Sequence, residues 1–172
     1  MALIAHELAQ AWVAGALGGE PSLISSTGTR VEWSRLRRSG VLFVGVSGWA
    51  ANAVVALMGW LLFRRLSGPA RIGETVPRAR RPTTSALVAW LLFAVNAWIP
   101  ALYLVASPAF AFGDWTTIID QFPDRGPLRA SLAATGLFIA GLVWKETKAS
   151  LARLVGNGSS ADRTARARRI VR

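Results

Sequence analysis

Cysteine is absent from this chain of 172 residues, and histidine occurs only once, at His6. The absence of cysteine excludes disulfide bonds, thiolate metal ligands and a cysteine nucleophile. Acidic residues are also scarce, because nine Asp and Glu stand against twenty Lys and Arg, and the formal net charge is +11. The position of that positive charge along the chain therefore bears on what the protein contacts.

Charge of either sign is missing from two long stretches. Ser39–Phe63 and Pro82–Gly113 contain no Asp, Glu, Lys or Arg, and 52% of the chain is hydrophobic. Each stretch is longer than the roughly 20 apolar residues that cross a bilayer core of about 30 Å. A helix of such length in a soluble protein would need a polar face. The pattern predicts an all-α integral membrane protein in contact with a lipid bilayer.

Turn and charge signals divide the chain into a membrane domain, residues 1–145, and a tail, residues 146–172. We expect about four membrane helices and a short hairpin or re-entrant element. The helices are expected at about residues 2–18, 40–63, 85–107 and 128–144. Ser22–Trp33 carries β-branched residues around a Thr-Gly pair and predicts a small hairpin or an interfacial loop. The tail is basic and is predicted to be partly disordered.

The basic residues lie between the apolar stretches and at the C-terminus, so they favour lipid-facing and topology-setting roles over nucleic-acid binding. The loop at residues 64–81 holds six Lys and Arg and the segment from Lys145 holds eight, against four and two on the opposite side. The positive-inside rule then predicts a multi-pass protein of the plasma (inner) membrane, with the 64–81 loop and the C-terminus cytoplasmic. With four spans the N-terminus would also start inside.

The opening helix carries the stretch HELAQ, with His6, Glu7 and Gln10. Zinc peptidases use His-Glu-x-x-His, in which two imidazoles on successive turns bind zinc and the glutamate activates the bound water. Gln10 occupies the second histidine position, and an amide oxygen is a much weaker zinc ligand than imidazole. The dipeptide alone is more often an accidental pair of interfacial polar residues.

Three further polar residues interrupt apolar sequence. Asp114 ends the second charge-free stretch, which is long enough to fold back and bring the carboxylate to membrane depth, although it also suits an ordinary external loop. Asn52 and Asn96 lie within predicted spans, where a buried amide most often bonds a neighbouring helix and less often lines a substrate site.

Taken in order, these motifs resemble those of the site-2-protease-like intramembrane zinc metallopeptidases. That family has HELGHA followed by small residues and Gly-Gly, then a Gly-x-x-x-Asn helix, then an asparagine-bearing helix that leads to an aspartate. The chain has HELAQAWVAGALGGEP, GWAANAVVALMG and NAWIPALYLVASPAFAFGDW, within Leu3–Trp115. The order and spacing are similar to a small bacterial branch of the family.

The resemblance implies a zinc cofactor, with His6 and Asp114 as ligands, Gln10 as a weak third donor and Glu7 as the catalytic acid or base. Peptide-bond hydrolysis is then in question, because the second histidine is missing, and a degenerate or inactive relative is expected. A cytoplasmic N-terminus would also hold His6 about 30 Å from an external Asp114, a full membrane away. Either the segment before Asp114 re-enters the membrane, or His6 lies at mid-depth because further chain precedes it.

Two other classes of function remain open on the sequence. One is a non-enzymatic assembly or regulatory subunit that binds partner helices through its small-residue faces. The other is a small transporter, which the lack of two broken repeats disfavours. A membrane-protein substrate or partner helices are the expected partners, and nucleic acid is not.

Overall fold

The computed structural model describes residues 2–24, 29–32, 35–67 and 83–155. These segments form five helices and one two-stranded hairpin. Their bounds are α1 Ala2–Ala16, β1 Pro21–Ile24, β2 Thr29–Val31, α2 Arg38–Ser67, α3 Thr84–Phe110, α4 Gly113–Ile119 and α5 Arg125–Val155. The predicted cytoplasmic loop at 68–81 and the end of the predicted tail, 156–172, lie outside the described residues.

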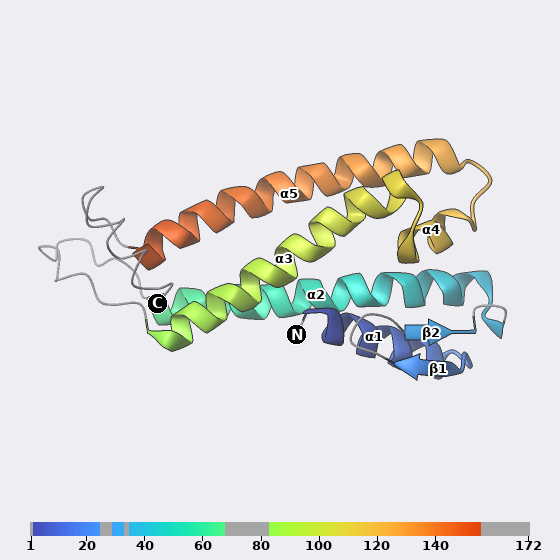
Figure 1. Ribbon diagram of the computed structural model, residues 1–172, viewed down its shortest axis with the longest axis horizontal. Coiled ribbons are helices and arrows are strands. Elements are labelled where there is room, and N and C mark those ends of the chain that lie inside the picture. The colour runs from blue at the N-terminus through green and yellow to red at the C-terminus, as the bar shows by residue number, and fades with distance from the viewer. Residues whose placement is uncertain (1, 25–28, 33–34, 68–82, 156–172) are drawn as a thin grey trace, which may run out of the picture.

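Three of the helices, α2, α3 and α5, are long and apolar enough to cross a membrane. They lie side by side as a bundle, with α3 crossing between α2 and α5 (Figure 1). The expectation of four membrane helices is corrected to three among the described residues, because α1 has only 15 residues. At 1.5 Å per residue, α1 is about 22 Å long, shorter than the apolar core of a bilayer.

Helix α1 packs against the first half of α2 and runs antiparallel to it (Figure 1). The register follows from two glycines: Gly40 of α2 faces Leu17, and Gly48 faces the imidazole of His6. Gly48 is ten residues into α2, or about 15 Å along its axis. His6 therefore lies near the middle of the helical bundle, not at one end of it.

The segment after α1 forms the predicted hairpin rather than an irregular loop. Strands β1 and β2 pair antiparallel, with Ile24 opposite Thr29 and a bulge between Pro21 and Leu23. Val31 of β2 is buried against Ala14 of α1 and Val44 of α2. The hairpin thus covers the C-terminal half of α1 at the same end of the bundle as α4 (Figure 1).

Between α3 and α4 the chain reverses direction within three residues. Ala111 adopts the left-handed conformation with φ 55° and ends α3, and Gly113 follows with φ 70°. The Ser107 hydroxyl bonds the carbonyl of Phe112 and fastens the turn. Helix α4 consequently lies beside both α2 and α3.

Helix α5 extends to Val155, eleven residues beyond the predicted membrane end at residue 144. Two tryptophan side chains hold this extension against the rest of the bundle. The indole Nε1 of Trp60 donates to Glu146 Oε1 at 2.9 Å, and that of Trp90 donates to the hydroxyl of Ser150 at 2.9 Å. The first part of the predicted tail is therefore an ordered continuation of α5.

Candidate functional site

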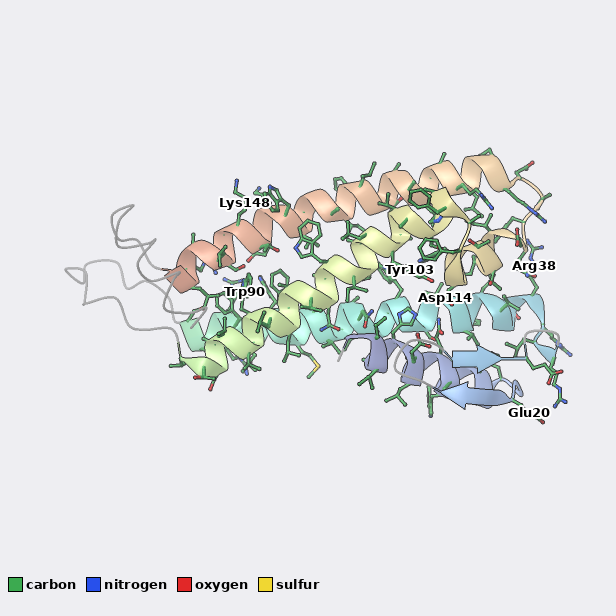
Figure 2. All side chains as sticks on the ribbon, in the orientation of Figure 1. Glu20, Arg38, Trp90, Tyr103, Asp114 and Lys148 are labelled. Carbon is green, nitrogen blue, oxygen red and sulfur yellow. The ribbon has the colours of Figure 1, made fainter. Side chains whose placement is uncertain are left out.

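His6 and Asp114 are in direct contact. The Nε2 atom of His6 lies 3.1 Å from Oδ2 of Asp114, across a separation of 108 residues in the sequence. His6 comes from the second turn of α1, and Asp114 from the first turn of α4. Figure 2 shows Asp114 pointing into the space between α1, α2 and α3. The two residues are therefore not a membrane thickness apart, since α4 packs beside α2 and α3 and brings Asp114 to His6.

A glycine of α2 makes room for the imidazole. A Cβ atom built on Gly48 would overlap the Nε2, Cδ2 and Cε1 atoms of His6. The ring therefore rests on the backbone of α2, and it is only 7% exposed. Gly48 is the glycine of the Gly-x-x-x-Asn element, so that element and the HELAQ stretch lie against each other.

Gln10 follows His6 by one helical turn and contacts the same nitrogen. Its Nε2 atom lies 3.2 Å from Nε2 of His6. One imidazole nitrogen cannot accept a hydrogen bond from an amide and at the same time donate one to a carboxylate. Half a turn of the Gln10 amide would instead place its oxygen there, so that two oxygens would flank Nε2. Such an arrangement suits either a proton on Nε2 or a cation bound between these groups.

Asp114 is held in place by Tyr103 of α3. The phenolic oxygen accepts the backbone N–H of Asp114 at 2.9 Å and lies 3.4 Å from Oδ2 of the same residue. Gly113 permits this contact, because a Cβ there would overlap the tyrosine hydroxyl. Its positive φ also disfavours any other residue. Tyr103 thus fixes the aspartate in the way that outer-shell partners orient metal ligands.

The contact borders a cavity of about 390 Å³ between α1, α2, α3 and the start of α4. Both apolar and polar side chains line this cavity, and two of the polar ones, Glu7 and Asp114, are acidic. The lining residues are Leu3, His6, Glu7, Gln10, Trp49, Asn52, Ile99, Pro100, Tyr103, Phe112, Gly113 and Asp114. Neither lysine nor arginine is among these lining residues. The size is within the range of small-ligand sites in proteins.

The remaining residues singled out in the sequence fall into two groups. Glu7 lines the cavity and is 6% exposed, and Asn52 lines it and is fully buried. Asn96 is buried as well, but its Nδ2 donates to the carbonyl of Leu92 within α3, and it is not among the lining residues. The structure therefore brings Asn52 to the site and leaves Asn96 as a residue of the helix interior.

The donor set fits a weakly held cation better than a strong zinc site. In the described part of the chain, no three His, Cys, Asp or Glu side chains are grouped so that they could hold a metal ion. A third donor would have to be the Gln10 amide oxygen. Tetrahedral zinc with bonds of about 2.0–2.1 Å separates its ligand atoms by about 3.3 Å. The 3.1 Å distance from His6 Nε2 to Asp114 Oδ2 is close to that spacing, whereas the 3.2 Å contact runs to the Gln10 amide nitrogen, which is not a zinc ligand.

Sequence reasoning did not single out Tyr103 or Trp49 as site residues. Tyr103 is the only tyrosine of the chain, and it lies within a charge-free stretch that also holds Asn96. Tyr103 and Asp114 are eleven residues apart, but a turn separates their two helices. Helical spacing therefore does not predict that the two residues meet. Trp49 lies directly after Gly48 and is one of eight tryptophans, a residue type that in membrane proteins is typical of the interface.

Comparison of the chain with protein-family models, with curated proteins and with solved structures gives no match. The motifs and the geometry of this site are therefore the features that bear on function.

Proposed function

We propose that the protein is a bacterial inner-membrane protein similar to the site-2-protease-like metallopeptidases, with a degenerate site that binds a membrane-embedded peptide segment. The observation that carries the proposal is the 3.1 Å contact between His6 Nε2 and Asp114 Oδ2. The resemblance pairs these two residues as metal ligands, and they are 108 positions apart. If the motifs resembled those of the family only by chance, there would be no reason for His6 and Asp114 to be in contact.

The three candidate spans support a membrane location. Large apolar side chains of α2, α3 and α5 face outward, and only 6% of the most apolar window of α5 is buried. In water such a surface would promote association, whereas lipid covers it without cost. In this arrangement His6 and Asp114 lie about half-way through the apolar core, where ionisable groups generally serve a function.

In the proposed site His6, Asp114 and the Gln10 amide would hold a zinc ion. Bound zinc supplies a polarised water at neutral pH. Glu7, next to His6 and at the cavity wall, is placed to accept a proton. Tyr103 keeps Asp114 oriented. Since Gln10 replaces an imidazole, we expect weak metal binding and little or no peptide hydrolysis, and the retained property is peptide binding in the cavity.

Zinc analysis of the detergent-purified protein tests the metal part of this proposal. After incubation with zinc and removal of excess, we expect bound zinc that is lost in His6→Ala and in Asp114→Asn. Asp120→Asn is the matched control, because Asp120 ends the same helix and pairs with the exposed Arg125. Zinc-free wild-type protein, with both variants as stable as the wild type, would overturn the proposal and favour an assembly subunit that acts through helix contacts.

A further inference from the structure

Two side chains of α2 that line the candidate cavity hold buried polar atoms without a hydrogen-bond partner in the described part of the chain. The indole Nε1 of Trp49 and both amide atoms of Asn52 are withdrawn from water and make no hydrogen bond there. Trp49 and Asn52 both line the cavity. They are three residues apart in one helix, so they lie on the same face of α2.

Such groups are unusual in a folded protein, because a buried polar atom that loses water normally gains another partner. Asn52 is 0% exposed. The body of the Trp49 ring packs with Leu104, Trp115 and Ile118, so the ring is anchored while its N–H has no acceptor among the described residues. A buried tryptophan N–H usually finds one. The pair is therefore in place for an acceptor that enters the cavity.

We propose that Trp49 and Asn52 form a recognition site for the backbone N–H and C=O of one residue of the bound segment. The indole N–H is a donor only, whereas the asparagine amide offers both donors and an acceptor. The carbonyl of that residue can accept from Trp49 Nε1 and from Asn52 Nδ2, and its N–H can donate to Asn52 Oδ1. In an extended chain of trans peptide bonds these two groups point to the same side, so one residue satisfies all three atoms, and an ester oxygen in place of its N–H leaves the acceptor unsatisfied.

The charge of the cavity selects a neutral ligand over an acid. Its lining includes Glu7 and Asp114 and no lysine or arginine. A carboxylate bound at Trp49 and Asn52 would share this cavity with two acidic groups and find no basic partner on its wall. Apolar walls at Leu3, Ile99 and Phe112 suit an aliphatic side chain beside the amide. The ligand class is the backbone of an apolar peptide, as in a transmembrane segment.

This inference rests on the proposed function in taking a peptide as the ligand, but its test needs no metal. The protein is treated with chelator, labelled with ¹⁵N in tryptophan and titrated with N-acetylvaline N-methylamide in detergent. The indole signal that disappears in Trp49→Phe identifies Trp49. We expect this signal to move downfield on titration, and the apparent Kd to weaken about tenfold in Asn52→Ala. The analogue with an ester oxygen in place of the valine N–H, and N-acetylvaline with its free carboxylate, should bind at least about tenfold more weakly than this peptide amide.

Asn96→Ala is the matched control, because Asn96 is equally buried and is bonded within α3. It should leave the Kd within about twofold. A second measurement separates ligand recognition from a structural role. Removing an unsatisfied polar group should leave thermal stability unchanged or raised in Asn52→Ala, whereas a helix-bridging asparagine would lower it.

An unmoved Trp49 signal, or equal affinity for amide and ester, would overturn the amide site. A clear loss of stability in Asn52→Ala would do the same. A negative zinc experiment leaves these results unaffected, so failure of the metal site and failure of the amide site can be told apart.

Discussion

The imidazole of His6 rests on the backbone of Gly48, so that no side chain fits between α1 and α2 at this level. This contact sets the depth of His6 in the bundle and leaves its Nε2 directed toward Asp114. Glycine is required here for space and not for backbone freedom, because Gly48 has ordinary helical geometry within α2.

Gly48→Ala should therefore lower stability and disturb the His6–Asp114 contact. Overpacking of this kind costs about 1–3 kcal/mol. His6→Ala removes the ring that the new methyl group meets, so the double variant should regain most of the loss caused by Gly48→Ala. Thermal unfolding in detergent measures this coupling. Gly141→Ala is the control, because Gly141 of α5 has no atom within 4 Å of an added Cβ; coupling of Gly141 to His6 would contradict the argument.

Restoring the missing imidazole should strengthen zinc binding. Gln10→His places a second ring one turn from His6, where Gln10 already lies 3.2 Å from Nε2. We expect an affinity gain of at least about tenfold, equivalent to about 1.4 kcal/mol, measured by competition with a zinc indicator. Gln121→His adds the same residue at the end of α4 and should give no gain. Equal affinities for the two variants would indicate that the HELAQ stretch has no metal-site geometry.

Tyr103→Phe removes the hydroxyl that accepts from the Asp114 backbone and contacts its carboxylate. Loss of an outer-shell partner typically lowers metal affinity about 10- to 100-fold. The effect is best measured in the Gln10→His background, where binding should be stronger. Thr116→Val, in the same short helix as Asp114 but with its hydroxyl bonded to Phe112, is the comparison variant. An unchanged zinc affinity in Tyr103→Phe would indicate that Asp114 is not a metal ligand.

The long spans could be predicted from the sequence because soluble proteins rarely contain helices without charge over lengths such as Ser39–Phe63. The first helix was overcounted as a span for a reason also visible in the sequence: Gly18 and Gly19 end it after 15 helical residues. Its apolar character comes from packing on α2 and from the surface it presents outward, with Trp12 76% exposed. An apolar composition indicates that a helix is buried or contacts lipid, but it does not show that the helix crosses the membrane.

The resemblance suggested that His6 and Asp114 could meet, but no rule applied to the residues alone predicts the contact. It depends on the register of α1 on α2 and on the left-handed turn at Ala111. Alanine is a poor signal for such a turn, since αL conformations favour glycine and asparagine. The end of α5 was misplaced for a different reason. Lys145 and Glu146 begin a polar run that suggests a tail, but Glu146 accepts the indole N–H of Trp60 and the helix continues.

The lack of cysteine makes the membrane orientation directly measurable, because any introduced cysteine is unique. Asp124 lies in the exposed connection between α4 and α5, and Ser67 ends α2 at the opposite end of the bundle. The excess of basic residues in the 64–81 loop predicts that Ser67 lies on the cytoplasmic side. In intact cells a membrane-impermeant maleimide should therefore label Asp124→Cys and spare Ser67→Cys until the inner membrane is opened. Labelling of Ser67→Cys alone in intact cells would indicate the opposite topology. Labelling of both would be incompatible with α2, α3 and α5 as three successive spans.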